Sequence, residues 1–172
     1  MYTLNWRPPY DWQWMFGFLG ARAVTGVETV TERYSERSFA CEGHQGIFRV
    51  RADTQRNTLT VALSPGLEPV APRCLERIER LFDLACDPKQ IADALGELGS
   101  ARPGLRLPGA MDAYEQGVRA LLGQPASVAL AAQLASRVVA LCGAPVKDAP
   151  ASTCFPTPPA PAASHPLAPY AP

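Results

Sequence analysis

Hydrophobic residues recur at helical spacing in the first part of the chain. Asp11 is a residue type that caps helices. The apolar residues after it share one helical face: Trp12, Met15, Phe16, Leu19 and Ala23. The sequence therefore predicts a helix that begins after Asp11. Gly17 and Gly20 each cost such a helix about 1 kcal/mol relative to alanine, so they indicate that another element packs close to its backbone.

Apolar and polar residues alternate between residues 27 and 63, which is typical of strands with one buried face. The alternating segments are 27–30, 37–41, 47–50 and 58–63. Turn-forming residues separate them, and Pro65-Gly66 closes the set. We expect an antiparallel meander with helices on one face, and therefore an α+β fold.

Helical spacing returns after residue 70. Pro72 is placed to start a helix, and the residues predicted to point inward are Leu75, Ile78, Leu81, Phe82 and Ala85. Asp87-Pro88 is predicted to end this helix and to cap a short successor. The inward residues of that successor are Ile91, Leu95 and Leu98. These helices complete the predicted first domain, residues 1–100.

Residues 101–110 have the composition of a linker, and we place a domain boundary there. A helical stripe follows at Met111, Tyr114, Val118, Leu121 and Leu122. It stops at Gly123, and Ser127 is predicted to cap a second helix that ends at Gly143. Residues 111–143 are therefore predicted to be part of a helical domain.

The composition changes abruptly in residues 144–172. Half of the chain's 18 prolines lie there, and no acidic or basic residue remains after Asp148. Such a segment has little periodic apolar surface with which to offset its chain entropy. We expect it to be a disordered tail, and we expect the chain to be truncated.

Charge and composition exclude several function classes. The chain has 16 Lys and Arg against 16 Asp and Glu, so no overall basic field favours nucleic acid. It contains neither a signal peptide pattern nor an apolar run long enough to span a bilayer, so we expect a cytoplasmic protein without membrane contact. Its five cysteines form no metal-ligand pattern and are expected to be reduced core thiols.

Catalytic motifs are absent from the sequence. It contains no phosphate-binding loop, no metalloprotease motif and no hydrolase serine elbow. Asp112 and Glu115 lie one helical turn apart, but such pairs usually form a solvated face. We expect neither a metal nor a cofactor.

Several long segments resemble one protein family. They are Met1–Trp6, Pro8–Trp12, Gly66–Val70, Ala101–Gly109, Leu122–Gln124 and Ser127–Ala129. They are similar to the AlkA-type 3-methyladenine DNA glycosylases II, over residues 1 to about 158. The resemblance implies a TATA-binding-protein-like antiparallel sheet with helices, followed by the start of an all-helical glycosylase domain.

The resemblance also implies an activity. That family flips an alkylated base out of double-stranded DNA and hydrolyses its glycosidic bond. The reaction needs a positioned carboxylate and water, and no cofactor. We expect a monomer whose partner is alkylated double-stranded DNA.

Three residues match positions that serve the family's site. The resemblance implies that Phe18 and Gln124 belong to the base pocket, and that Pro125 is the wedge inserted into the duplex. Each has a second interpretation from the residues alone: Phe18 as a core aromatic, Gln124 as a helix end and Pro125 as a helix breaker. Arg22 is predicted to orient pocket groups or to form an ion pair.

The family's catalytic aspartate and its DNA-binding hairpin are expected beyond position 172. We therefore expect the 172-residue chain to be inactive alone, although it is a glycosylase by family. The alternative is a non-enzymatic module that binds DNA or protein. A third possibility is a folded fragment without function.

Overall fold

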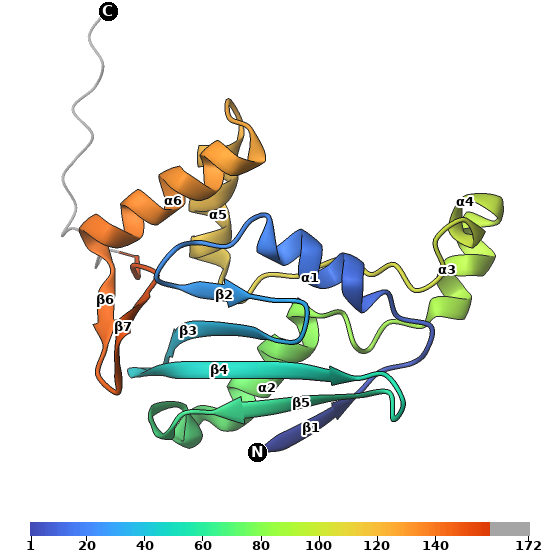
Figure 1. The fold of residues 1–172 in the computed structure, drawn as a ribbon, viewed down its shortest axis with the longest axis horizontal. Coiled ribbons are helices and arrows are strands. Elements are labelled where there is room, and N and C mark those ends of the chain that lie inside the picture. Colours follow the sequence, from blue (N-terminus) through green and yellow to red (C-terminus); the bar gives the residue numbers. More distant parts are fainter. Residues whose placement is uncertain (159–172) are drawn as a thin grey trace, which may run out of the picture.

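The computed structural model describes residues 1–158, and Figure 1 shows their arrangement. The strands are β1 (Tyr2–Asn5), β2 (Glu28–Val30), β3 (Ser35–Cys41), β4 (His44–Asp53), β5 (Thr58–Leu63), β6 (Ala144–Val146) and β7 (Ala149–Cys154). The helices are α1 (Trp12–Gly20), α2 (Ala71–Leu81), α3 (Pro88–Leu95), α4 (Glu97–Ser100), α5 (Ala113–Gly123) and α6 (Val128–Cys142), with a 3-10 helix, η1, at Pro65–Val70. The predicted α+β class is confirmed.

The first five strands form one antiparallel sheet in the order β1-β5-β4-β3-β2. The four predicted strands are present as β2 to β5. β1 is an additional strand, in which Tyr2 lies opposite Val61 and Leu4 lies opposite Leu59. Only two apolar residues alternate in β1, so its pairing with β5, rather than its local pattern, makes it a strand.

One face of the sheet is buried under helices. Phe48 and Val50 of β4 and Val61 of β5 share that face and have no solvent exposure. The same core cluster includes residues of two helices: Trp12, Met15 and Phe16 of α1, and Cys74, Ile78 and Leu81 of α2. The prediction of a sheet covered on one face is confirmed.

The helices α3 and α4 do not join this core. They lie at one end of the molecule, away from the sheet (Figure 1), and bury no residue. Leu95 and Leu98, predicted to point inward, are 51% and 84% exposed. Asp87 caps α3 as predicted, because its side chain accepts a hydrogen bond from the backbone N–H of Lys89.

The predicted linker is a loop fixed to the N-terminal segment. Gly104 has a φ of +86°, and a Cβ there would lie 2.8 Å from the backbone nitrogen of Tyr10. Arg106 is buried, donates hydrogen bonds to the carbonyls of Arg7 and Pro9, and lies 5.0 Å from the centre of the Tyr10 ring. The loop therefore packs as part of the first core, and the domain boundary stays a prediction.

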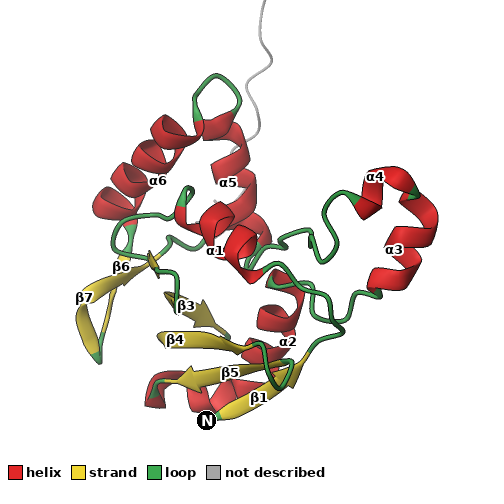
Figure 2. Ribbon diagram, turned by 45° about the vertical axis from the view of Figure 1, so that its right-hand side comes forward, coloured by secondary structure: helices red, strands yellow, loops and turns green. Residues whose placement is uncertain are grey.

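Helices α5 and α6 form an antiparallel pair above the sheet (Figure 2). Their inner residues join a second, smaller core whose members are Val24, Val27, Ala135, Val139 and Phe155. Ser127 caps α6 as predicted. Even α6, with 15 residues, does not approach the length of a bilayer-spanning helix, and no other described helix does.

The prediction of a disordered tail is wrong for residues 144–158. β6 and β7 form a hairpin in which Val146 and Cys154 are buried, and Phe155 follows them into the second core. The carbonyl of Thr153 accepts a hydrogen bond from Ser38 Oγ at 2.6 Å, and its backbone N–H donates to Gly26 at 2.7 Å. These long-range contacts offset the conformational entropy that the segment loses on folding. Its composition alone does not indicate them.

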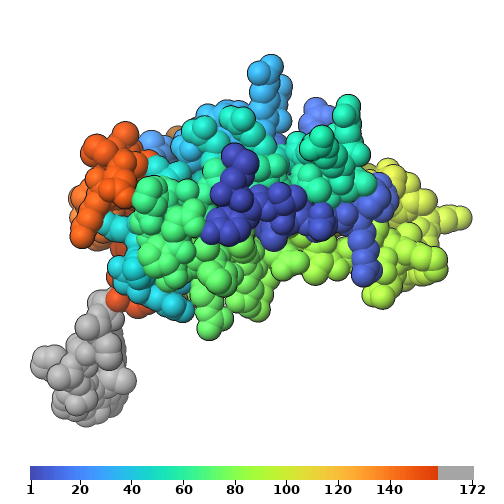
Figure 3. Space-filling model, turned by 90° about the horizontal axis from the view of Figure 1, so that it is seen from below, coloured from blue at the N-terminus to red at the C-terminus, as the bar shows by residue number. Residues whose placement is uncertain are grey.

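Figure 3 shows the orange hairpin at the opposite end of the molecule from α3 and α4. Residues 159–172, the rest of the predicted tail, lie outside the described residues.

Candidate functional site

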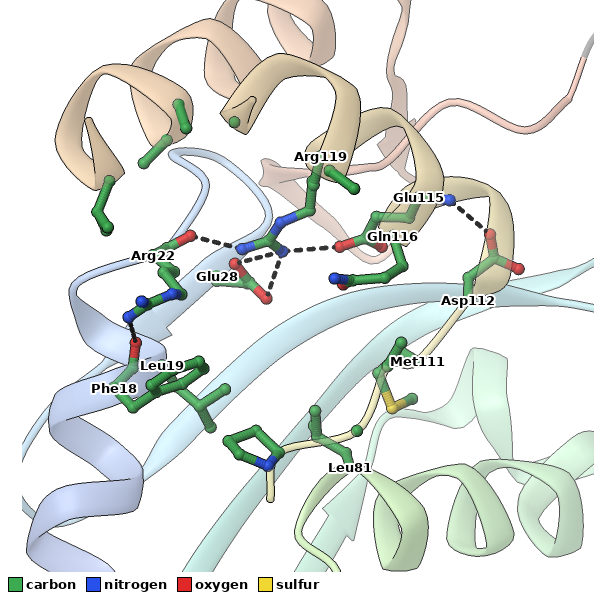
Figure 4. Close-up of a pocket in the computed structure, with 18 of the residues that line it drawn as sticks. Phe18, Leu19, Arg22, Glu28, Leu81, Met111, Asp112, Glu115, Gln116 and Arg119 are labelled. Carbon is green, nitrogen blue, oxygen red and sulfur yellow. Dashed lines mark hydrogen bonds and ion pairs between the residues drawn. The ribbon is translucent and has the colours of Figure 1, made fainter. Parts of the chain in front are cut away.

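A groove of about 280 Å³ lies between α1, the 108–111 loop, α5 and the start of α6 (Figure 4). Phe18 and Arg22 line it from the end of α1, and Gln116 and Arg119 line it from α5. Met111 and Leu81 add apolar surface. The groove thus combines one aromatic ring with several polar groups, which is typical of small-molecule sites.

Phe18 is half-buried and carries a cation on one ring face. The guanidinium of Arg22 lies 3.7 Å from the centre of the Phe18 ring and donates a hydrogen bond to the Phe18 carbonyl. The ring of Trp14 lies 5.2 Å away, centre to centre. A planar ligand that stacks on the face of Phe18 covered by Arg22 must first move that guanidinium.

A buried cluster of four charged residues forms another wall of the groove. Its members are Glu28 from β2, Arg37 from β3, and Glu115 and Arg119 from α5. Arg37 donates to Glu115 at 2.6 Å and to Glu28 at 3.1 Å. Arg119 donates to Glu115 at 3.0 Å and to Glu28 at 3.3 Å. Each carboxylate is therefore shared between two arginines.

Arg37 keeps its charge although its side chain is shielded from water. Burial on its own would lower the pKa of the Arg37 guanidinium, but the carboxylates of Glu115 and Glu28 outweigh burial and raise that pKa. Arg37 and Glu115 are only 5% and 6% exposed. The expectation that Asp112 and Glu115 form a solvated face is therefore wrong for Glu115.

The sequence analysis missed this cluster, although two signals were present. Arg37 has the same strand parity as Phe39 and Cys41, which indicates an inward side chain. Glu115 and Arg119 are four residues apart on one helix, the spacing of an ion pair. Neither signal identifies Glu28 as the shared partner. It lies directly opposite Arg37 in the β2–β3 pair, but its contact with Arg119 joins residues far apart in the sequence.

All three carboxylates that line the groove are engaged. Glu28 also accepts a hydrogen bond from the backbone N–H of Val24, in addition to its two arginines. Asp112 caps α5 by accepting from the backbone N–H of Glu115 at 2.9 Å, and Arg77 lies 3.9 Å from it. Among residues 1–158, no carboxylate in the groove is left unpaired to accept a proton from water.

Gln124 and Pro125 lie in the tight loop between α5 and α6. Both residues are exposed, and neither belongs to the groove lining, whereas Gly123 and Ala126 on either side of them do. Gln124 is the C-terminal cap residue of α5. The structure thus places Phe18 in the groove and Gln124 and Pro125 next to it.

Cysteine and metal chemistry contribute little to the groove. None of the five cysteines is paired, and Cys142 is exposed, which corrects the expectation of five core thiols. Burial raises the pKa of the Cys74 thiol to about 11. The described part of the chain holds no group of three or more His, Cys, Asp or Glu side chains that is arranged for a metal.

The AlkA N-terminal domain family matches residues 1–112 of the chain. Over 168 residues, covering 98% of the chain and 60% of the relative, the chain is 57% identical to "DNA-3-methyladenine glycosylase 2" of Escherichia coli K12. It is 35% identical over 151 residues to the Mycobacterium tuberculosis protein named "Probable bifunctional transcriptional activator/DNA repair enzyme AlkA", covering 83% of the chain and 29% of that relative. The chain thus spans less than two thirds of either curated relative.

A solved 3-methyladenine DNA-glycosylase from Archaeoglobus fulgidus has a similar fold. It superposes with a TM-score of 0.70 over 91% of the chain and 56% of that protein. Sequence identity in this superposition is 16%, so the likeness concerns the fold alone.

Proposed function

The chain belongs to the AlkA N-terminal domain family, and we propose that it supplies one wall of the base pocket of a DNA-3-methyladenine glycosylase of base-excision repair. The observation that carries the proposal is the half-buried ring of Phe18 in a groove beside the exposed Gln124-Pro125 loop. Its partner is alkylated double-stranded DNA, and its compartment is the cytoplasm.

The groove suits an extrahelical base. An aromatic ring stacks favourably on an electron-poor alkylated purine, and Phe18 is the ring available in the groove. The Gln124 amide can both donate and accept hydrogen bonds. Pro125 presents an exposed apolar ring, the kind of wedge that minor-groove proteins insert between base steps. Binding would therefore use Phe18 for the base and the loop for the duplex.

Hydrolysis of the glycosidic bond requires a free carboxylate, and the groove does not offer one. Alkylation leaves a positive charge on the base, so hydrolysis needs chiefly a group that stabilises the developing sugar cation or activates water. Glu28, Glu115 and Asp112 are held by arginines and by a helix cap. We place the catalytic carboxylate outside residues 1–158, which makes the described part a binding wall.

A titration of the 172-residue chain with free 3-methyladenine, followed by NMR, tests the pocket. The backbone amide signals of Phe18, Leu19 and Gln116 should shift, and Phe18→Ala should remove the shifts. Tyr34→Ala serves as a control, because Tyr34 lies in the turn between β2 and β3, next to Arg49, and does not line the groove. Shifts confined to other regions, or unchanged in Phe18→Ala, contradict the proposal.

The engaged carboxylates also favour a second candidate, a module that binds DNA or protein without catalysis. A base-release assay on the 172-residue chain joined to the unmatched part of the E. coli relative separates the two functions. The first function predicts cleavage by that assembly, and the second predicts none.

A further inference from the structure

Four side chains with oxygen atoms line the groove that holds Phe18. Three are the carboxylates of Glu28, Asp112 and Glu115, and the fourth is the amide of Gln116 on α5. The carboxylates accept hydrogen bonds from arginines and from backbone N–H groups. Within the described part of the chain, the Gln116 side chain has no hydrogen-bond partner, and only its backbone N–H is bonded, to the Asp112 carbonyl. The groove therefore keeps one side-chain acceptor available to a ligand.

Helix geometry directs Gln116 into the groove. It shares one side of α5 with Arg119, Ala120 and Gly123, which follow it by three, four and seven residues. All of them line the groove, and Gln116 is exposed to solvent there. Figure 4 shows its side chain extending from α5 toward the side of the groove that carries Phe18. The free amide and the aromatic ring therefore face the same space.

The arginines of the groove cannot replace Gln116 as an acceptor. Arg22, Arg37 and Arg119 carry guanidinium groups, which donate hydrogen bonds and accept none. They are also occupied, since Arg22 donates to the Phe18 carbonyl and Arg119 donates to the Arg22 carbonyl. An amino group on a ligand in this groove therefore has the amide oxygen of Gln116 as its free side-chain partner.

Apolar surface lies beside the amide. Met111 and Leu81 line the same groove and are only 2% and 6% exposed (Figure 4). A hydrogen bond is stronger next to such surface than in water, and a polar group left there without a partner is costly. A ligand that offers no donor to Gln116 is therefore at a disadvantage.

We propose that the amide oxygen of Gln116 accepts a hydrogen bond from the exocyclic amino group of an adenine-type base stacked on Phe18. Proteins that flip a base out of the duplex read it by stacking and by hydrogen bonds to its polar edge. Alkylation places a positive charge on the base, which strengthens the amino group as a donor. Gln116 thus selects for the amino group, whereas Phe18 stacks on any electron-poor purine. The assignment rests on the proposed function, because it takes Phe18 as the stacking surface.

A comparison of two ligands tests this contact. 3-Methylpurine is 3-methyladenine without its exocyclic amino group, and NMR titration of the 172-residue chain gives the affinity for each. 3-Methyladenine should bind about two- to tenfold more tightly, which is the effect of one hydrogen bond. Gln116→Leu should lose this preference, because the amino group has lost its acceptor. The ratio of the two affinities does not depend on how much of the variant is folded, so a folding defect cannot imitate the result.

Gln133→Leu is the matched control, since Gln133 is an exposed glutamine of α6 that does not line the groove. It should keep the preference for 3-methyladenine. An unchanged preference in Gln116→Leu overturns the inference, and so does a wild type that binds both bases equally. Either result leaves the proposed function intact if Phe18→Ala weakens the binding of both bases. A wild type that binds neither base, or binding that Phe18→Ala does not weaken, counts against the proposed function, and the inference falls with it.

Discussion

Arg119 donates a hydrogen bond to the backbone carbonyl of Arg22 at 2.6 Å. This bond ties α5 to the end of α1, and Arg22 in turn covers the ring of Phe18. The same guanidinium binds Glu28 and Glu115, so one side chain joins both walls of the groove to the buried charge cluster. The width of the groove therefore depends on a group that does not itself need to touch a base.

Arg119→Ala should destabilise the chain by about 3 kcal/mol, because it leaves Glu28 and Glu115 buried with one partner fewer. Urea unfolding followed by circular dichroism measures the loss. Lys89→Ala is the control: its ion pair with Asp93 is exposed on both sides, and such pairs contribute little. Equal stability of the Arg119 variant and the wild type would show that the cluster contributes no net stability.

Phe155→Ala should cost about 3 kcal/mol, the usual cost of truncating a buried aromatic side chain. Limited proteolysis should cut the variant within 144–158 at a protease concentration that leaves the wild-type hairpin intact. Leu98→Ala, at a residue 84% exposed, should leave both readouts unchanged. Early cleavage of the wild-type hairpin would restore the original expectation of disorder.

The features that the sequence predicts correctly depend on residues close together in the chain. Asp11, Asp87 and Ser127 cap their helices as expected, because capping depends on a side chain and a backbone N–H two or three residues away. The strands β2 to β5 carry their own alternation. β1, the β6–β7 hairpin and the pairing of Glu28 with Arg119 depend on partners far along the chain, and no local pattern specifies them.

The same distinction applies to the site. The resemblance implies that Phe18 belongs to a base pocket, and the structure places its ring in the groove with the guanidinium of Arg22 over one face. Gln124 and Pro125 stay predictions as base and duplex contacts, because both lie in an exposed loop and neither lines the groove.

Free energy of unfolding should fall between about pH 8.5 and 11, in part through Cys74. A thiol in the unfolded chain loses its proton near pH 8.5, whereas burial raises the pKa of Cys74 in the folded state to about 11. The contribution is thus fully present below pH 8.5 and lost as the pH rises through 11, by up to about 3 kcal/mol. Comparing wild type with Cys74→Ala at pH 8 and pH 11 isolates it, since the other titrating groups are common to both. A difference that does not change with pH would contradict the assignment.

Arg22→Ala should tighten binding of 3-methyladenine by about two- to fivefold. The variant frees the ring face of Phe18, and the cation–π contact that a stacking base must otherwise break contributes about 0.5–1 kcal/mol. NMR titration gives both affinities, with Arg51→Ala on the open sheet as the control. Weaker binding in Arg22→Ala would instead make Arg22 a direct contact to the base.

The 172-residue chain should release no 3-methyladenine from methylated duplex DNA. Phe18, Gln124 and Pro125 can stack, hydrogen-bond or wedge, but none is a carboxylate base. Arg37 and Arg119 hold the glutamates of the groove, and Asp112 accepts a backbone hydrogen bond as the cap of α5. To take a proton from water, one of these carboxylates would have to give up such a partner. Chromatography of the supernatant after incubation measures released base against a control without protein. Release above that control, lost in Phe18→Ala, would show that a groove carboxylate is catalytic. Asp112→Asn would then be the first variant to make. Asp112 is the least buried of the three carboxylates and is held chiefly by a single backbone N–H.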